Sequence, residues 1–429
     1  MPALFRYTFD YAFRAFLIII PFMTVLSIFF RERLGIPGFA FIKELLLFSM
    51  LFTILWAHIS WKMRIVWSGY DLWIAVYIVL LLGISVFTTG LPGIVYGGRY
   101  DFAFLIAFFT LYHGFLLLEK PASYYLKLFL ISGGIMLTIS MLLKWPLSED
   151  LLLYLGYSGN PSNWQFGNSV PIFHGVDGAN VRRFQWLLDG PNTMGAFILV
   201  YVGMLIYFLR NKKAWHFLLG CSVVWFFILI LYTYSRSAAL GFIGWVGIVI
   251  LFSLREIFRK YKVQFIVTFC IVLLMVGGIF IQYAGNMKAI IQRGGSTNGH
   301  LERMQVGIER FISAPLWQGL SSAWPWYRYV QNLESLDRTQ IEEKDRYYIP
   351  ESWYIQQLVE WGIFWFLAFV WICLSLLIGL YRKNIILAGM FVSILIMNMF
   401  LHTFESAIVS LSLFLLIGLI LAPSRSHGK

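Results

Sequence analysis

The chain has 429 residues, of which 59% are hydrophobic, 19% aromatic and only 13% charged, and its mean hydropathy is +0.74. A soluble domain carries about 25% charged residues, so this composition excludes an ordinary soluble enzyme and indicates that lipid surrounds most of the chain. The formal net charge of +12 would suggest a nucleic-acid partner for a soluble protein. In a membrane protein, cytoplasmic lysine and arginine that set topology explain it, and we expect no nucleic acid.

Apolar runs long enough to cross a bilayer recur along the whole sequence. They predict an all-α integral membrane protein, with residues 1–429 forming a single transmembrane domain. Twelve spans are expected, at residues 12–30, 39–57, 70–88, 101–118, 125–144, 192–209, 216–234, 237–254, 263–283, 353–381, 385–402 and 405–422.

The short loops between these spans differ sharply in charge. One alternating set holds thirteen Lys and Arg residues, and the other holds four. The positive-inside rule places the richer set in the cytoplasm. Both termini are then cytoplasmic, and the two long loops, 145–191 and 284–352, are predicted to lie on the extracytoplasmic side.

The large loop 284–352 is the most polar stretch of the chain, with eight basic and eight acidic residues. Within it, the spacing of Met304, Gly307, Ile308 and Phe311 predicts an amphipathic helix lying over the membrane surface. Loop 145–191 is rich in Gly, Asn and Pro, so an irregular, turn-dominated segment is expected there.

Arginine outnumbers lysine on the predicted outer side, twelve to three. Lysine suffices as a topology signal, whereas the planar fork of arginine suits phosphate and carboxylate groups. The bias therefore favours a site for an anionic ligand, although pairing with the loop's own acids or a position at the lipid headgroups is the alternative for each residue. The candidates for binding a diphosphate are Arg99, Arg182, Arg183, Arg236 and Arg303.

Glu351 is the candidate general base. It precedes Trp353 and Tyr354 at the start of the tenth span, where burial by aromatic rings would raise its pKa. The alternative is an ordinary glutamate that complements a helix N-terminus. Asn192, beside Pro191, begins the sixth span and offers a donor at its positive end.

Other polar residues near the spans are interpreted as structural. Lys43 and Glu44 form an interfacial pair, and His402 and Glu405 lie between the last two spans. Scattered histidines and the lack of an Asp-x-Asp or His-x-x-x-His motif predict no metal site.

Four segments together resemble the O-antigen ligase/polymerase family, membrane glycosyltransferases of the GT-C type. They occur in the family's order, and the twelve predicted spans with a large outer loop before span 10 agree with it. The segments are Arg182-Arg183-Phe184 through Pro191-Asn192-Thr193-Met194-Gly195, Ser235-Arg236-Ser237-Ala238-Ala239-Leu240-Gly241, His300-Leu301-Glu302-Arg303 with Ala314-Pro315-Leu316-Trp317-Gln318-Gly319, and Glu351-Ser352-Trp353-Tyr354 with Glu360-Trp361-Gly362.

The resemblance implies transfer of sugar chains from an undecaprenyl-pyrophosphate carrier at the outer face of the bacterial inner membrane. Arginines are implied to hold the pyrophosphate without a metal or other cofactor, and Glu351 to activate the acceptor hydroxyl. Ser352, Tyr354, Asn192 and His300 are expected to position the acceptor. Membrane lipids, the lipid-linked oligosaccharide and other polysaccharide-assembly proteins are the implied partners.

One pair of residues decides whether the chain is more similar to the polymerase branch or to the ligase branch. Ligases typically carry His and Asn where this chain has Glu351 and Ser352, so the pair is more similar to polymerases, which join repeat units. Val306 replaces a usual Trp, and Gly319 is not followed by the second glycine. A ligase acting on lipid A-core is the alternative, and a flippase for lipid-linked glycans is a weaker one, since arginine is concentrated on one side.

Overall fold

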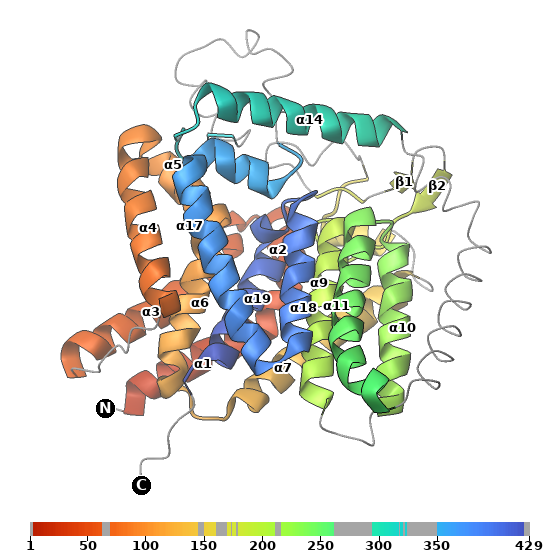
Figure 1. The fold of residues 1–429 in the computed structure, drawn as a ribbon, viewed down its shortest axis with the longest axis horizontal. Helices are drawn as coiled ribbons and strands as arrows, with labels where there is room; N and C mark the ends of the chain where they lie inside the picture. Colours follow the sequence, from red (N-terminus) through yellow and green to blue (C-terminus); the bar gives the residue numbers. More distant parts are fainter. Residues whose placement is uncertain are drawn as a thin grey trace.

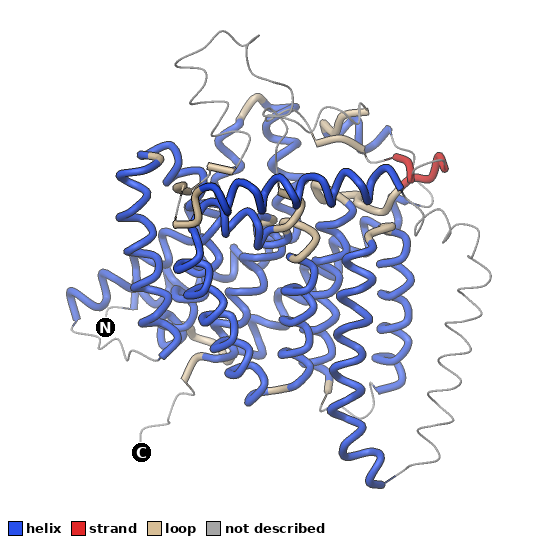
Figure 2. The backbone as a smooth tube through the Cα atoms, turned by 45° about the horizontal axis from the view of Figure 1, so that its top comes forward, coloured by secondary structure: helices blue, strands red, loops and turns tan. Residues whose placement is uncertain are grey.

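A computed structural model describes residues 3–61, 69–144, 150–159, 170–172, 174–176, 179–210, 216–260, 294–316, 318–320, 322–323 and 350–423. The helices run side by side as a bundle, and one helix lies across an end of it (Figures 1 and 2). The predicted span 263–283 lies outside the described residues.

The first half of the chain forms helices that cross the bundle in succession. In chain order they are α1 (Ala3–Ile19), η1 (Ile20–Phe22), α2 (Met23–Leu34), η2 (Pro37–Phe41), α3 (Ile42–Trp61), α4 (Gly69–Thr88), α5 (Gly90–Gly97), η3 (Gly98–Phe102), α6 (Ala103–Gly114), η4 (Phe115–Leu117), α7 (Ala122–Lys144) and α8 (Asp150–Leu155).

The second half continues the bundle and adds one surface helix and a short hairpin. Its elements are β1 (His174–Val176), β2 (Ala179–Arg182), α9 (Pro191–Leu209), α10 (His216–Tyr232), α11 (Arg236–Lys260), α14 (Gly294–Ser313), α17 (Trp353–Lys383), α18 (Ile385–Asn398), η8 (Thr403–Glu405) and α19 (Ala407–Leu421).

Seven helical segments within the described part of the chain are long and apolar enough to cross a membrane. Four shorter apolar helices accompany them, over Gly220–Tyr232, Arg236–Val249, Ile385–Asn398 and Ala407–Leu421. Each of the eleven coincides with a predicted span. The multi-pass, helical character of the protein is therefore confirmed, while the count of twelve remains a prediction.

Local sequence explains where the first span bends and stops. Pro21 has no backbone N–H, and the helix tightens to a 3-10 turn at Ile20–Phe22 before α2 continues. Gly35 then ends α2 in the left-handed conformation, with φ of 66°, which costs glycine little.

Aromatic side chains form the core beside the N-terminal part of α17. Trp353, Trp361, Phe369 and Phe404 are all buried, and their rings meet at tilted or edge-to-face angles with centroids 5.0–6.3 Å apart. Such pairs add to the stabilisation from burial. This cluster holds the start of α17 rigidly against the bundle.

The polar segments gather at one end of the bundle. Helix α14 and the hairpin β1–β2 lie at this end, whereas α1 begins and α19 ends at the other (Figure 1). The described residues of segment 145–191 are less irregular than expected, because they include α8 and the antiparallel strands in which His174 pairs with Arg182. The chain is thus not purely helical.

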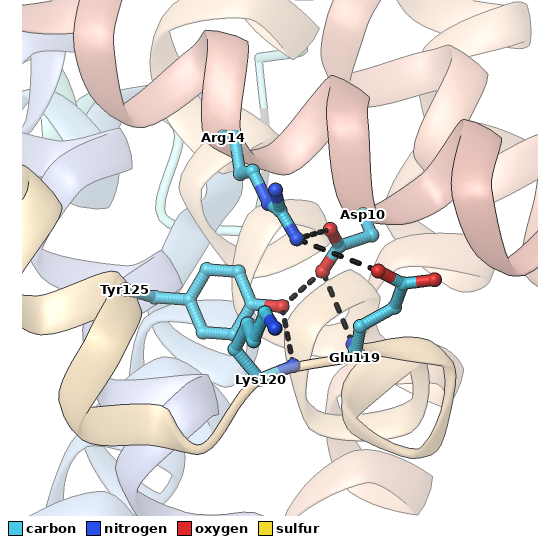
Figure 3. Close-up of polar contacts among 5 residues, drawn as sticks. All are labelled: Asp10, Arg14, Glu119, Lys120 and Tyr125. Atoms are coloured by element: carbon cyan, nitrogen blue, oxygen red, sulfur yellow. Dashed lines mark hydrogen bonds and ion pairs between the residues drawn. The ribbon is translucent and has the colours of Figure 1, made fainter.

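An ionic clamp joins α1 to the turn between α6 and α7 (Figure 3). Buried Asp10 contacts Arg14, accepts a hydrogen bond of 3.1 Å from the backbone N–H of Glu119, and accepts a second from the Tyr125 hydroxyl. Arg14 also lies 3.6 Å from the Glu119 carboxylate. Because the partners satisfy this buried carboxylate, the clamp fixes the first helix against the bundle.

Candidate functional site

Helix α14 is the predicted amphipathic helix, extended at both ends, and it packs on α17. In Figure 1 it lies over the first part of α17. Gly307 is buried and Met304 and Phe311 are partly buried, as the spacing predicts. Ile308 shares this face by spacing and is 45% exposed.

The segment after α14 fits into a break in α17. Gly362 has φ of 74° inside the helix, and a Cβ at this position would lie 1.4 Å from the carbonyl oxygen of Leu316. The N–H of Ile363 donates to Pro315 O at 3.1 Å, and the N–H of Gly319 donates to Glu360 O at 3.0 Å. Two motif segments of the sequence analysis therefore dock directly on each other.

Glu351 lies where α14 meets the start of α17. Its Oε2 is 3.0 Å from Nδ1 of His300, and its Oε1 accepts a hydrogen bond from Nη1 of Arg303. The side chain of Glu351 is 18% exposed, against 36% for His300 and 45% for Arg303. The structure thus brings together three of the predicted site residues.

These partners change the expected ionisation of Glu351. Burial would raise the pKa of Glu351, but the hydrogen bond and charge of His300, together with the charge of Arg303, outweigh burial and lower it. The prediction of a raised pKa is therefore wrong. Glu351 is a stable carboxylate at neutral pH.

His402 completes the surroundings of Glu351. It lies in the segment between α18 and α19, and its Nε2 is buried without a hydrogen-bond partner. Burial lowers the pKa of His402 to about 4, although Glu351 and the carbonyl of Pro350 act in the opposite direction. The ring is consequently neutral at physiological pH.

A second pair of motif segments meets at the start of α11. Nε of Arg183 donates to Thr233 O at 3.0 Å, and Nη2 lies 3.4 Å from both Tyr234 O and Asn192 Oδ1. Tyr234 adopts a left-handed conformation, with φ of 52°, which is strained for a non-glycine residue. Arg183 and Asn192 therefore hold the strained turn that presents Arg236.

Gly195 allows this turn to approach α9. A Cβ on Gly195 would lie 2.5 Å from Cβ of Ala238. Arg236 is the first residue of α11 and is partly exposed. Strand β2, whose last residue is Arg182, lies at the end of the bundle that also carries α14 (Figure 1).

A cavity of about 220 Å³ opens near the same end, between α2, α3, η3 and η8. Its lining includes the cationic residues Arg31, Lys43 and Arg99 and the acids Asp189 and Glu405. Lys43 is only 8% exposed. Cations suit phosphate oxygens and carboxylates suit sugar hydroxyls, so this lining matches a phosphorylated sugar.

Arg99 reaches this cavity from within a helix. It lies in the π-helical turn η3 rather than at the opening of the fourth span, which begins earlier, at α5. Nε of Arg99 lies 2.7 Å from Glu44 Oε1, and Lys43 Nζ lies 3.1 Å from the same oxygen. Glu44 therefore holds together Lys43 and Arg99, which both line the cavity.

One short segment connects the cavity with the Glu351 cluster. Glu405 lines the cavity and accepts a 2.7 Å hydrogen bond from Gln356, which lies five residues after Glu351 on α17. His402, beside Glu351, lies three residues before Glu405. The two features therefore adjoin.

Ser352 and Tyr354 have structural contacts. Ser352 is buried, and its carbonyl accepts from the N–H of Gln356 at 3.0 Å at the start of α17. The Tyr354 hydroxyl donates to Leu395 O at 2.8 Å. Both residues position α17, and Tyr354 does so against α18.

Residues 221–370 match the family model described as O-antigen ligase. The resemblance to the O-antigen ligase/polymerase family is therefore confirmed over this segment. The match includes the segments at 235–241, 300–319 and 351–362 that carry the resemblance, whereas the segment at 182–195 lies before it. No curated protein matches the chain.

Members of the O-antigen ligase family are glycosyltransferase-like enzymes that act on lipid-linked glycans. Four residues near the candidate site were not predicted to belong to it: the sequence analysis interpreted Lys43, His402 and Glu405 as structural and did not single out Arg31. Each lies within a few residues of an end of a predicted span, where charged side chains are common. Only the packing of distant helices reveals that Lys43 and Glu405 share a cavity and that His402 adjoins Glu351.

Proposed function

We propose that the protein is a polysaccharide polymerase that transfers glycan from a polyprenyl diphosphate to an acceptor sugar of another lipid-linked unit. The observation that carries this proposal is the Glu351 cluster adjoining a cavity lined by cations. The cluster offers groups that handle a proton, and the cavity offers groups that hold phosphate. A glycosyl transfer from a diphosphate carrier needs both.

The leaving diphosphate gains negative charge as its bond to the sugar breaks. Fixed cations stabilise that charge without reorganisation during the reaction. We assign this role to Arg99, Lys43 and Arg236, and to the exposed guanidinium of Arg303, which keeps further donors beside its contact with Glu351. Arg183 is hydrogen-bonded to the turn before Arg236 and so acts by positioning Arg236. Arg182 precedes Arg183 in the sequence. No metal is required for this neutralisation.

The proposal places the reaction at the periplasmic face of a bacterial inner membrane. The end of the bundle with α14 would face the periplasm, and both termini would be cytoplasmic, as the distribution of Lys and Arg predicts. The loop 284–352 would cover the sugars during transfer.

The proposal is tested with purified protein and a defined undecaprenyl-pyrophosphate oligosaccharide, with products separated on gels. We expect a ladder of longer lipid-linked glycans that persists in EDTA. Glu351→Gln should lower the rate by about 100-fold or more, because the cluster loses its charged centre. Glu309→Gln, on the exposed face of α14, is the matched control and should retain the wild-type rate.

Two results would contradict the proposal. Near wild-type polymer from Glu351→Gln would remove Glu351 from the acid–base machinery. Loss of product in EDTA with recovery in Mg²⁺ would contradict the metal-free mechanism.

A ligase that transfers glycan to lipid A-core is the second candidate, and the description of the matching family model favours it. It would use the same donor and a similar site. Supplying both lipid A-core and lipid-linked acceptor distinguishes the two, because a ligase attaches glycan to core and a polymerase lengthens the lipid-linked chain. Movement of lipid-linked glycan across vesicles without a new glycosidic bond would instead indicate a flippase.

A further inference from the structure

His300 and Glu351 form a pair whose two members differ in access. The Nδ1 atom of His300 lies 3.0 Å from Glu351 Oε2, while Arg303 contacts the other carboxylate oxygen. The side chain of His300 is 36% exposed, twice the 18% of Glu351. In the described part of the chain, no hydrogen-bond partner is found for Nε2 of His300.

Glu351 is poorly placed to take a proton from a substrate. Both of its oxygens already have partners, and the proton that it would accept competes with the positive charges around it. An imidazole in the same cluster has one nitrogen fixed by the carboxylate and the other open. A carboxylate behind a histidine holds the ring in one tautomer and stabilises the imidazolium that forms.

We propose that His300 is the general base of the transfer reaction and that Glu351 is a positioning residue that orients its ring. The proposal rests on the proposed glycosyl transfer, and it moves the proton-accepting atom from the carboxylate of α17 to Nε2 of a histidine on α14. His300 was expected only to position the acceptor.

The chemical step then balances as follows. The acceptor hydroxyl oxygen forms a bond to the anomeric carbon of the donor sugar. The bond between that carbon and the diphosphate oxygen breaks, and its electron pair leaves with the polyprenyl diphosphate. The hydroxyl proton moves to Nε2 of His300, and the imidazolium keeps its Nδ1–H directed at Glu351 until solvent removes the proton.

The surroundings of His300 are consistent with this role. Among the described residues, the charged or titratable groups that face the pair are Arg303 from α14 and His402 from the segment before η8. Arg303 occupies Oε1 of Glu351, so Oε2 is left for the imidazole. Neither group blocks the exposed edge of the ring.

Assembly of the base requires two helices. His300 belongs to α14, and Glu351 immediately precedes α17, so the pair exists only when α14 is docked. The docking contacts at Pro315 and Gly319 secure the other end of α14. The same docking therefore positions the proton acceptor.

The test uses full-length purified protein, the defined lipid-linked oligosaccharide and four variants. His300→Ala should lower kcat by about 100- to 10,000-fold, the range of general-base catalysis. Added imidazole should restore part of the rate in His300→Ala and leave the wild type unchanged. The double variant His300→Ala/Glu351→Gln should be no slower than His300→Ala, since residues that act as a unit are not additive. Gln305→Ala, exposed on the same helix, is the control and should match the wild type.

Three outcomes separate the possibilities. If His300→Ala is folded and retains the wild-type rate while Glu351→Gln is inactive, Glu351 is the base and the inference is overturned. A second outcome is that His300→Ala is folded but slow and imidazole does not restore its rate. If the double variant is then slower than His300→Ala by the full factor that Glu351→Gln causes alone, His300 is only structural and the inference is again overturned. If the wild type forms no glycosidic bond, the proposed function itself fails, and this inference fails with it.

Discussion

At the scale of single residues, ionisation in the site depends on neighbours that are remote in the sequence. Glu351 is flanked by aromatic residues along the chain, which suggests a raised pKa. In space it is surrounded by His300, Arg303 and His402, and its pKa is lowered. Whereas its neighbours keep Glu351 charged, burial lowers the pKa of His402 and keeps that basic group neutral.

The neutral state of His402 predicts a specific pH dependence of stability. Its pKa is lowered from 6.5 to about 4 in the folded protein, so between these values the unfolded chain binds a proton that the folded protein does not. Stability should therefore fall as the pH decreases from 6.5 towards 4. We expect the Tm of the wild type in detergent to fall more steeply over this window than that of His402→Gln.

His58→Gln is the control for this measurement, because His58 is exposed in the last turn of α3. Its Tm should follow the wild-type curve. The lowered pKa of Glu351 acts below its ordinary value of 4.5, where protonation removes the stabilisation that the carboxylate provides. Parallel curves for wild type and His402→Gln between pH 6.5 and 4.5 would contradict a buried neutral His402.

At the scale of elements, the site is built by docking α14 and the segment that follows it onto α17. The break at Gly362 exposes the carbonyl of Glu360, which accepts from Gly319, and makes room for Leu316. The segment Pro315-Leu316 thus packs against Glu360-Trp361-Gly362, which belongs to the last motif. The physical reason for both motifs is a close approach of two backbones.

Gly362→Ala should disrupt this docking. A Cβ would collide with Leu316 O at 1.4 Å, and alanine is also strained at φ of 74°, which together cost about 2 kcal/mol or more. We expect loss of glycosyl transfer and faster hydrogen exchange of backbone amides in residues 300–313, with the remaining helices unchanged. Both quantities are measured on purified protein.

Gly83→Ala is the matched control. Gly83 lies within α4, and nothing is found within 4 Å of the position that its Cβ would occupy. This change should preserve activity and stabilise the helix by up to about 1 kcal/mol. Wild-type exchange in α14 of Gly362→Ala would show that docking does not depend on the break.

At the scale of the whole molecule, the bundle separates two ends with different chemistry. One end carries α14, the hairpin β1–β2, the cavity and the Glu351 cluster. The other carries the Asp10–Arg14 clamp and the turn between α6 and α7 (Figures 1 and 3). The predicted orientation assigns the first end to the periplasm.

Cysteine labelling tests this orientation. In a cysteine-free background, Glu302→Cys on the exposed side of α14 should react with an impermeant maleimide added to intact spheroplasts. Lys120→Cys, in the exposed turn between α6 and α7, should react only after the membrane is permeabilised. The reversed pattern would invert the topology and place the candidate site in the cytoplasm.

The sequence by itself determined the membrane environment, the positions of eleven described apolar helices, the amphipathic helix α14 and the resemblance to a known family. These features depend on local composition and periodicity, because a bilayer requires apolar helices of a minimum length. The Pro and Gly residues that shape α2 and α9 are also local signals. Local sequence also predicted which polar residues near span ends are candidates for the site, namely Arg99, Arg183, Arg236, Arg303 and Glu351.

Only the tertiary structure decided what those polar groups contact. It paired Arg303 and His300 with Glu351, committed Arg183 to the turn before Arg236, and placed Lys43 with Arg99 in one cavity. These partners are separated by 48 to 56 residues in the sequence, and no periodicity links them. A pKa or a binding site depends on charges within a few ångströms, so the packing of distant helices, rather than the local sequence, sets the chemistry of the site.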